Sequence, residues 1–593
     1  MWQHATPAKP SKYVGSSLSV LIPILLLCLA SLIGKCWSFR VNICPIRSIG
    51  GHKTELGHVR HREGDNYPGS LYAVPEGAFS VKGKTVKSPF LFELIERGLI
   101  ANATDLARLD ELFCSRESAA KSTDVPAVYY GIDLTANFIH EGTLLQLLLL
   151  RRFLAQGFNV VVLLGGGTTL VGDPSFKSKR TKATITSSES GNTRYNAILD
   201  RITPCASVKE DNYAGILEVV KKLLTRELET VDGHLVHPAL KLASAIGDGD
   251  LTKVTSTPYN VVVVNNRDIY DRVTLTEYLG TVARNMSVGR MLSRECIKSR
   301  LLYTEEAGVT TLRMANMDLA EFIYMSLQAT DFVHVASKYN AVIQLGGSDQ
   351  MGNIMSGIEL ANGLNNLSKP LFGITTPLLQ TRSGEKVSKS NSEELLRITA
   401  DIPPLVFWSH FRNVDDQVVG RYLQWLTQVP INNIDEALAK HVNTAKVLLA
   451  DELTSSIFGK RYTDALQEHW VKGDVANVTK PRENCSTEEY DSLVTFVDCV
   501  PHVEVSLDQL TQGVPFAELL DMLRTPQLVS GLFYSNRRAI REGTCRINGI
   551  VETHVDRLVT ANDLLNVSCE DGRSMQYIAL QFGKRQLYLA VLK

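Results

Sequence analysis

The sequence predicts an α/β protein whose largest domain is a Rossmann-like, doubly wound parallel sheet. Apolar strand-like runs alternate with helical stretches, and these runs are Ala127–Thr135, Val160–Leu164, Val261–Val264 and Ala341–Gln344. Three polar, glycine-rich clusters follow directly after predicted strands. Ligands of such sheets bind beyond the carboxyl ends of the strands, so the pattern predicts a binding site at that edge.

Length and composition set the outer limits. A chain of 593 residues is longer than one hydrophobic core serves, so several domains are expected. Hydrophobic residues make up 44% and charged residues 21%, which is ordinary for a globular protein. The formal net charge of -1 means that a nucleic-acid partner would need local basic patches. The 10 cysteines contain no C-x-x-C pair, and no metal site built by the protein is expected.

The N-terminal region reads as a targeting leader. Residues 18–33, LSVLIPILLLCLASLI, are almost wholly apolar, follow Lys9 and Lys12, and are followed by small residues near Ser38. This pattern is typical of a signal peptide, and residues 1–38 are assigned to it. The run is short for a membrane-spanning helix, which needs about 20 residues, but a signal anchor stays an alternative. Residues 39–84 are basic and lack any period, as in a disordered transit segment.

Three domains are predicted after the leader. Residues 85–392 form the domain that contains the parallel sheet; it begins with a helix at Phe90–Ile100 and contains a buried helix at Gly142–Phe153. Loop-like sequence within residues 182–258 is interpreted as an insertion. Residues 393–505 are helical in pattern, without strand signals. Residues 506–593 read as a small α+β domain, in which Asn548-Gly549 predicts a hairpin.

Two clusters follow the first two strands. The first, YYGIDLTANFIHEGT from Tyr129 to Thr143, runs from a strand through a glycine turn to His140 and a helix start. Backbone N–H groups at a helix N-terminus favour an anion, and the histidine adds a donor, although a histidine there can equally be a helix cap. The second, LLGGGTTLVGDPS, places Asp173 after three glycines, either as a functional carboxylate or as a turn residue before Pro174.

Three further clusters carry polar side chains. Tyr324, Gln328 and Asp331 have the spacing i, i+4, i+7 and share one helix face, which forms either a solvated surface or a polar pocket wall. The fourth cluster, QLGGSDQMGN, follows a strand and could be an ordinary glycine loop. The fifth, SGEKVSKSN, carries Lys386 and Lys389, which could neutralise a polyphosphate or lie on a charged surface loop.

Taken together and in order, the clusters resemble the class I aminoacyl-tRNA synthetases and, among them, the bacterial-type tyrosyl enzymes. HEGT at His140–Thr143 is similar to the HIGH signature, and KVSKS at Lys386–Ser390 is similar to KMSKS. GGSDQMGN resembles the GGSDQWGN segment of tyrosyl enzymes, and GDPS matches as well. The resemblance extends from about Phe90 to the C-terminus, apart from the insertion, and implies a catalytic domain followed by a helical anticodon-binding domain and an αL-type RNA-binding domain.

The resemblance implies a set of site residues. Tyr129 and Asp331 would read the substrate hydroxyl, because a buried phenol needs polar partners that phenylalanine would leave unpaired. The remaining tyrosine-binding residues would be Asp133, Asp173, Tyr324, Gln328 and Gln350. ATP would be bound by Gly131, Thr135, His140, Gly142, Gly347, Asp349, Lys386, Lys389 and Ser390. The catalytic groups would be His140, Thr143, Lys386 and Lys389, acting on ATP with Mg²⁺ on its phosphates.

Three positions depart from the family pattern. Thr143 replaces the second histidine of HIGH, and a hydroxyl can donate a hydrogen bond to ATP but carries no charge. Met351 replaces the tryptophan of GGSDQWGN, and Leu134 replaces a proline. None of these changes removes a residue that would read tyrosine.

The C-terminal segment SNRRAIREGTCRING resembles an αL RNA-binding motif. Arg537, Arg538 and Arg541 would lie along one helix and contact tRNA phosphates, with a solvated basic face as the alternative. The implied partners are tRNA(Tyr), L-tyrosine and ATP, with a homodimer as the usual family assembly. The leader implies a plastid enclosed by extra membranes, such as an apicoplast, with a mitochondrion as the alternative and no membrane association for the mature protein.

Three other readings compete with this one. A tryptophanyl enzyme has a related fold, but Tyr129, Asp331 and the αL segment argue against it. An RNA-binding protein built on an inactive synthetase is favoured only by Thr143. A protein anchored by residues 18–33 would keep an uncleaved N-terminus.

Overall fold

The computed structural model describes residues 79–81, 84–118, 124–173, 206–245, 248–298, 301–306, 309–314, 319–365, 367–379, 396–472, 478–523, 535–583 and 586–593. All of them belong to one compact unit, Ala73–Lys593. Within these ranges, no helix is both long and apolar enough to cross a membrane. The leader, including residues 18–33, lies outside the described residues.

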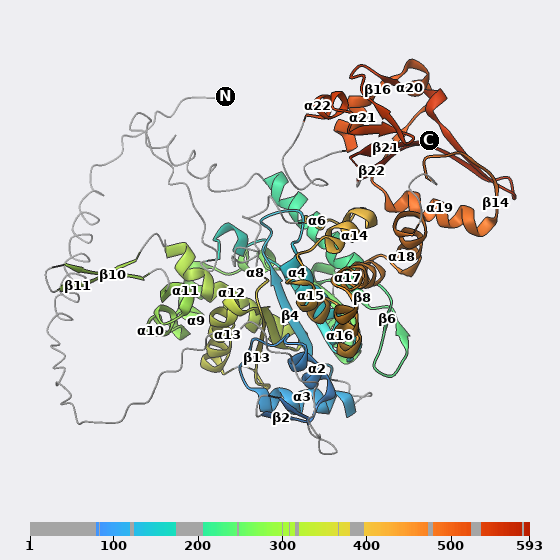
Figure 1. The fold of residues 1–593 in the computed structure, drawn as a ribbon. Helices are drawn as coiled ribbons and strands as arrows, with labels where there is room; N and C mark the ends of the chain where they lie inside the picture. The colour runs from blue at the N-terminus through green and yellow to red at the C-terminus, as the bar shows by residue number, and fades with distance from the viewer. Residues whose placement is uncertain are drawn as a thin grey trace, which may run out of the picture. The chain divides into compact units, whose positions relative to one another are not determined.

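A seven-stranded sheet forms the centre of the catalytic region (Figure 1). Its strands are, in spatial order, β3 (Asn102–Ala103), β13 (Phe372–Thr376), β12 (Ala341–Gly347), β4 (Ala127–Ile132), β5 (Asn159–Leu164), β9 (Asn260–Asn265) and β8 (Ala239–Leu242). Every neighbouring pair is parallel except β13 with β3. The four strands predicted from the sequence are β4, β5, β9 and β12, and the expected parallel α/β sheet is confirmed.

Both faces of the sheet are apolar, because alternate residues of each strand enter different cores. Val160 and Val162 of β5 join one buried cluster, whereas Val161 and Leu163 join another. Helices cover the first face, and these are α2 (Pro89–Glu96), α3 (Leu106–Ser118), α4 (Glu141–Ala155) and α6 (Ala206–Leu224). The second is covered by α7 (Asp248–Ser256), α12 (Leu319–Tyr339) and α13 (Met351–Leu364). Burial on both faces explains the nearly continuous valine runs.

The interpretation of residues 182–258 as an insertion needs correction. Helix α6 packs its residues Ile216, Val220 and Leu224 into the main core, and β8 forms an edge of the central sheet. The serine-rich part that suggested a loop lies outside the described residues. The apolar spacing along α6 is a regular helical period that the sequence analysis did not use. The folded region also begins before Thr85, because β1 (Phe79–Val81) pairs with β2 (Lys84–Val86).

Small elements complete the catalytic region. They are the hairpin β6 (Leu228–Glu229) with β7 (Leu235–Val236), the hairpin β10 (Leu301–Glu306) with β11 (Val309–Met314), and the short helices α8 (Arg267–Tyr270), α9 (Leu275–Thr281), α10 (Val288–Leu292) and α11 (Glu295–Lys298). In Figure 1, α9 to α11 lie beside α12 and α13.

The region after the sheet is helical as far as residue 471. Its elements are α14 (Pro404–Arg412), α15 (Val419–Leu426), α16 (Ile431–Lys440), α17 (Val442–Ile457), α18 (Lys460–Leu466) and a π-helical turn at Gln467–Val471, with α19 (Thr487–Cys499) farther on. Two strands within residues 393–505 were not predicted from the sequence. Strands β14 (Arg482–Cys485) and β15 (His502–Val505) both join the C-terminal sheet, pairing with β20 and β22.

The C-terminal region is a mixed sheet with three helices. Its other strands are β17 (Cys545–Ile547), β18 (Ile550–Glu552), β20 (Leu565–Cys569), β21 (Ser574–Phe582) and β22 (Gln586–Leu592), beside the short pair β16 (Val514–Pro515) and β19 (Leu558–Val559). The helices are α20 (Leu507–Gln512), α21 (Phe516–Leu523) and α22 (Asn536–Arg541). The predicted Asn548-Gly549 turn joins β17 to β18, with both residues at positive φ, 48° and 81°.

Candidate active site at the carboxyl edge of the sheet

The carboxyl ends of β4, β5, β9 and β12 meet at one edge of the sheet, because these strands are parallel neighbours. Asp133 follows β4, and Asp173 lies beyond β5. Asn266 follows β9, and Asp349 and Gln350 follow β12. The strand order changes direction between β4 and β12, where doubly wound sheets open a crevice for ligands.

A continuous chain of hydrogen bonds crosses this edge. Tyr324 Oη donates to one oxygen of Asp133 at 3.0 Å, and Thr168 Oγ1 donates to the other at 3.0 Å. Asn266 Nδ2 donates to Thr168 and to Asp331 Oδ2, both at 3.0 Å. A β-carbon at Gly165 would lie 2.4 Å from Asp133 Oδ1, so only glycine fits beside this carboxylate. This row of hydrogen bonds fixes the carboxylates of Asp133 and Asp331, which lie about two hundred residues apart in the sequence.

Asp331 is the most deeply buried carboxylate of the edge, with 2% of its surface exposed. Tyr270 Oη donates to Asp331 Oδ1 at 2.6 Å, beside the bond from Asn266. Burial raises the pKa of Asp331 to about 7, and the charge of Asp133 adds to the rise, while the bonds from Tyr270 and Asn266 oppose it. A carboxyl group poised near neutrality at a pocket wall is a candidate for ligand recognition.

Tyr129 lies on the same side of the sheet as Asp331. Its ring is 1% exposed and packs 5.7 Å from the ring of Phe332, the residue after Asp331. Burial raises the pKa of Tyr129 well above its usual value, and the charges of Asp331 and Asp133 act in the same direction. The two residues expected to read a phenol therefore occupy one electrostatic environment.

A second set of hydrogen bonds joins the remaining polar residues. Gln350 Nε2 donates to Asp173 Oδ2 at 2.9 Å, and its Oε1 accepts from Gln328 at 3.3 Å. Asn353 Nδ2 donates to both glutamine side-chain oxygens, at 3.1 and 3.0 Å. Tyr324, Gln328 and Asp331 thus share one hydrogen-bonded face of α12, and the burial of Tyr324 and Asp331 shows that this face is not a solvated surface.

His140 caps α4. Its Nδ1 accepts from the backbone N–H groups of Gly142 at 3.0 Å and Thr143 at 3.3 Å. An accepting Nδ1 places the proton of a neutral ring on Nε2. The cap and the phosphate-donor readings of this histidine are therefore compatible.

Thr143 is buried, with 4% of its surface exposed, and its hydroxyl forms a hydrogen bond with Tyr130. Burial raises the pKa of Tyr130, and this hydrogen bond opposes the rise. The side chain that replaces the second histidine of HIGH is thus held against β4.

The SGEKVSKSN segment lies outside the described residues, and with it Lys386, Lys389 and Ser390. The chain that leaves this segment is placed next to the HEGT motif. Ile139 and Ile398 exchange two backbone hydrogen bonds of 3.0 Å in an isolated antiparallel bridge. The described chain that begins at Leu396 is therefore fixed at a point one residue before His140.

Four residues of the site were missed by the sequence analysis: Thr168, Asn266, Tyr270 and Asn353. Asn265-Asn266 directly follows the third predicted strand, so the rule that ligand-binding residues follow strand ends would have found Asn266. Asn353 lies inside the GGSDQMGN segment. Thr168 lies inside the LLGGGTTLVGDPS cluster, whereas Tyr270 had no local signal, because its partner Asp331 is distant in sequence.

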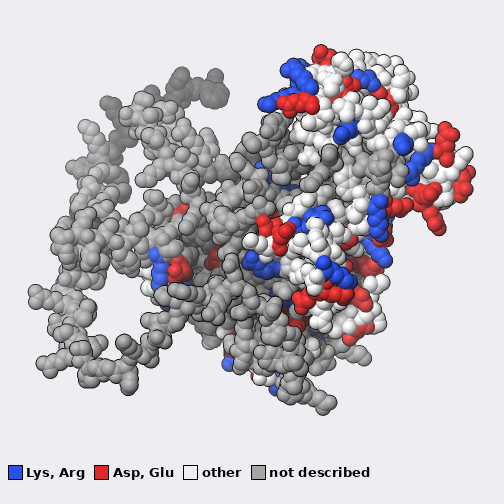
Figure 2. Space-filling view, viewed as in Figure 1, with Lys and Arg blue, Asp and Glu red and all other residues white. Residues whose placement is uncertain are grey.

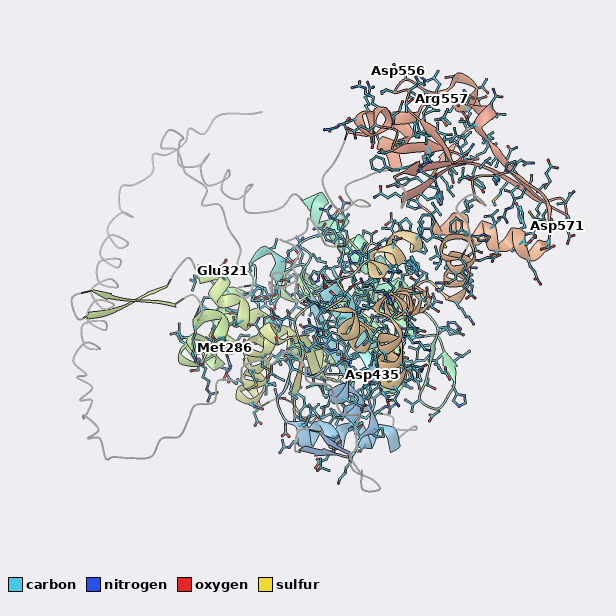
Figure 3. The ribbon with its side chains drawn as sticks, viewed as in Figure 1. Met286, Glu321, Asp435, Asp556, Arg557 and Asp571 are labelled. Carbon is cyan, nitrogen blue, oxygen red and sulfur yellow. The ribbon has the colours of Figure 1, made fainter. Side chains whose placement is uncertain are left out.

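The candidate RNA-binding arginines lie together on α22. Arg537, Arg538 and Arg541 are exposed, while Asn536, Ala539 and Ile540 form the buried side of the helix. Figure 2 shows Lys and Arg side chains gathered over this end of the C-terminal region. Arg557, labelled in Figure 3, instead pairs with Asp563 at 2.6 Å and Glu552 at 3.4 Å. The α22 arginines are thus available to a partner to different degrees, since Arg538 is bonded to Glu542 at 2.7 Å.

Fold and site together define an α/β protein of the doubly wound class, with a cluster of polar side chains at the carboxyl edge of its sheet. The family model described as tRNA synthetases class I (W and Y) matches residues 121–472. The tyrosine–tRNA ligase of Anaplasma phagocytophilum is 32% identical over 509 residues, which cover 85% of this chain and 99% of that protein. The corresponding ligase of Ehrlichia canis is 32% identical over 86% of this chain and 99% of its own. The chain belongs to the class I tRNA synthetases, in their tyrosyl branch.

Among solved structures, a C-terminally truncated mitochondrial tyrosyl-tRNA synthetase of Aspergillus nidulans is similar, with 25% sequence identity and a TM-score of 0.43. That similarity covers 64% of this chain and 92% of the other.

Proposed function

We propose that the chain is a tyrosine–tRNA ligase that acts in two steps. The carboxylate of L-tyrosine attacks the α-phosphorus of ATP, giving tyrosyl-adenylate and pyrophosphate. A ribose hydroxyl at the 3′ end of tRNA(Tyr) then attacks the acyl carbon and releases AMP. The buried Asp331, held by Tyr270 and Asn266 beside Tyr129, is the observation that carries the proposal, because it supplies a polar pocket end for a phenol.

The pocket residues have distinct roles toward tyrosine. Asp331 accepts a hydrogen bond from the substrate hydroxyl, and Tyr129 completes the polar end. Asp173, Tyr324 and Gln328 bind the α-ammonium group, which the carboxylate of Asp173 attracts. Asp133 accepts a hydrogen bond from Tyr324, and Gln350 donates one to Asp173. These two bonds hold Tyr324 and Asp173 in place.

ATP lies over the same edge, between the β4 and β12 ends. His140, through Nε2, and the backbone at Gly131, Thr135 and Gly142 meet its phosphates, while Gly347 and Asp349 meet the nucleoside. Lys386, Lys389 and Ser390 also act on the phosphates, and the chain after them returns at Ile398 to pair with Ile139, beside His140. Such transfer depends mainly on positioning and charge stabilisation.

Mg²⁺ would be carried by the ATP phosphates. Carboxylates such as Asp133 and Asp349 at this edge have the oxygen chemistry that Mg²⁺ accepts. Among the described residues, no group of three or more His, Cys, Asp or Glu side chains forms a metal site of its own.

An RNA-binding protein without catalysis is the second candidate, favoured only by Thr143. Tyrosine-dependent exchange between ATP and pyrophosphate separates the two. We expect the protein without residues 1–78 to exchange with tyrosine and not with tryptophan or phenylalanine. A folded protein that binds tRNA and exchanges with none of the three amino acids would support the second candidate.

A homodimer is supported by an apolar surface on α9 to α11 and the segments beside them. Five large side chains there are exposed, namely Leu275, Leu279, Val288, Leu292 and Leu319, at 37–73%. Exposed apolar patches of this kind mark protein interfaces. We expect Leu275→Glu with Leu279→Glu to convert a dimer to a monomer in sedimentation experiments, whereas Leu507→Glu, also at an exposed leucine, leaves it dimeric. A wild-type monomer would refute the assembly.

Organelle targeting rests on the sequence of residues 1–84. A plastid is the first destination and a mitochondrion the second. Fusing residues 1–84 to a fluorescent protein and imaging it against markers of both organelles tests this. An N-terminal sequence of the mature protein that still includes residues 18–33 would support a membrane anchor instead.

A further inference from the structure

A basic cleft lies apart from the carboxyl-edge site. Its volume is about 740 Å³, and none of the tyrosine-pocket residues lines it. Its cations come from three parts of the chain: α6 and the turn after it, the segment following Leu396, and α18. Residues 500–502 and the end of α21 form the remaining wall. In Figure 1, α6 and α14 lie beside one another at this position.

The cleft holds an excess of positive charge. Four cations and two carboxylates line it, namely Lys222, Arg226, Arg397, Arg461, Asp401 and Asp498, with His502 at the border. Within the part of the chain that the structure describes, none of the four cations forms an ion pair. Although the net charge of the chain is -1, this cleft carries more cations than carboxylates.

Two of the cations are held by carbonyl groups. Lys222 Nζ donates to Ala400 O at 2.7 Å and lies 4.4 Å from the centre of the Phe458 ring. Arg226 Nη1 donates to Ile457 O at 3.1 Å. Burial lowers the pKa of both side chains, and the charges of Asp401 near Lys222 and Glu227 near Arg226 offset only part of this effect. An anion in the cleft would stabilise both cations.

The other two cations rest on aromatic rings. The Arg397 guanidinium lies 5.2 Å from the centre of the Phe138 ring, and that of Arg461 lies 4.7 Å from the ring of Tyr462. Arg461 Nη2 also donates to the Tyr462 hydroxyl at 2.8 Å. Stacking orients a guanidinium plane but leaves its charge and most of its donors available to a phosphate.

We propose that this cleft binds the phosphate backbone of the tRNA. The inference rests on the proposed ligase function, because it says which part of the protein holds the tRNA away from its reacting 3′ end. Three observations favour an RNA backbone over a free nucleotide. The cations are spread over separate elements, the volume exceeds that of one phosphate, and the walls come from the catalytic, helical and C-terminal regions, so a ligand in the cleft would contact all three.

The test uses the full chain without residues 1–78 and the double variant Arg397→Ala with Arg461→Ala. The matched control, Arg108→Ala with Lys338→Ala, removes the same charge from exposed positions outside the helical and C-terminal regions. Direct binding of transcribed tRNA(Tyr) is measured by filter retention across salt concentrations, together with tyrosine-dependent pyrophosphate exchange. A third variant, Arg397→Lys with Arg461→Lys, keeps the positive charge at both positions.

We expect the alanine pair at 397 and 461 to weaken tRNA binding about 10-fold, and to lower the slope of log affinity against log salt by about 1 to 2. Exchange should stay within twofold of wild type, the control should bind normally, and the lysine variant should recover most of the affinity. Unchanged tRNA affinity in the alanine pair would overturn the proposal.

A last binding measurement uses inorganic tripolyphosphate as a small anion in place of tRNA. If the alanine pair lost tripolyphosphate binding but kept tRNA binding, the cleft would be a small-anion site and the RNA proposal would be wrong. If the wild-type protein showed no tyrosine-dependent pyrophosphate exchange, the ligase function would be refuted. The filter assay would still measure whether the cleft binds tRNA.

Discussion

The carboxylate of Glu141 lies 2.5 Å from Nε2 of His410, and this contact joins the residue after His140 to the helical region. Tyr422 Oη donates to the other carboxylate oxygen at 2.6 Å. Glu141 is 4% exposed. Burial would raise the pKa of Glu141, but the hydrogen bond and charge of His410, with the bond from Tyr422, outweigh burial and leave the pKa below its usual value. Glu141 stands where the HIGH signature has an apolar residue, so this contact is specific to the HEGT form.

His410→Ala is expected to destabilise the protein by about 2 to 4 kcal/mol, because it leaves the buried Glu141 carboxylate with one neutral donor. Urea unfolding at pH 7 measures the change. Tyr422→Phe, which removes only a neutral hydroxyl, should cost about 1 kcal/mol. Equal small effects of both substitutions would show that the pair contributes little. The contribution of Glu141 to the free energy of unfolding should be complete above pH 4.5, the pKa of an unperturbed glutamate. It should decline as the pH falls through the lower pKa that Glu141 has in the folded protein.

The use of tyrosine should depend on pH through Asp331. Its pKa of about 7 means that the acceptor carboxylate forms as the pH rises through neutrality. Because the substrate phenol donates to that carboxylate, kcat/KM for tyrosine in exchange should rise between pH 6 and 8 and then level, over about one unit on each side of the pKa. Asp331→Asn should lack this inflection. Persistence of the same inflection in the Asn variant would assign it to another group.

Asp331→Ala is expected to lower kcat/KM for tyrosine by at least about 100-fold and to affect phenylalanine far less, because only tyrosine loses a buried hydrogen-bond partner. Tyrosyl enzymes as a class are the general example of such discrimination, about 10⁵-fold against phenylalanine, and that magnitude belongs to the class. Exchange kinetics with both amino acids measure the ratio. Thr330→Ala, one residue earlier on α12, serves as a control. Undiminished use of tyrosine would refute the pocket assignment.

Thr143→Val keeps the shape of the side chain but removes its hydrogen bond with Tyr130. Leaving the partly buried Tyr130 hydroxyl without this partner should destabilise the protein by about 1 kcal/mol. If the Thr143 hydroxyl also contacts ATP, the KM for ATP rises in the exchange assay; Thr143→Ser should retain both properties. A valine variant with wild-type stability would contradict the structural role.

The arginines of α22 should contribute unequally to tRNA binding. In the described residues, Arg537 and Arg541 form no ion pair, whereas Arg538 is bonded to Glu542. Arg537→Ala and Arg541→Ala should each weaken tRNA binding and lower the salt slope by about 1, with a smaller effect for Arg538→Ala. Binding titrations at several salt concentrations measure the slopes. Tyrosine-dependent exchange is the internal control, since these residues are remote in sequence from the adenylation motifs.

Local patterns predicted much of the fold. Continuous apolar runs specified β4, β5, β9 and β12, and the Asn548-Gly549 pair specified the β17–β18 turn. The same reasoning failed over residues 182–258, where the apolar period of α6 was overlooked beside a serine-rich stretch. It also missed β14 and β15, which are short and partly exposed and owe their strand form to partners in the C-terminal sheet.

The sequence by itself determined which elements form and which side chains follow the strand ends, because periodicity and turn chemistry act between near neighbours. The tertiary structure decided which of those side chains meet. Tyr270 joins Asp331 across 61 residues, and Glu141 joins His410 across 269. The four cations of the cleft likewise come together only when separate elements pack. Contacts of this kind depend on burial and long-range pairing, which leave no local period in the chain.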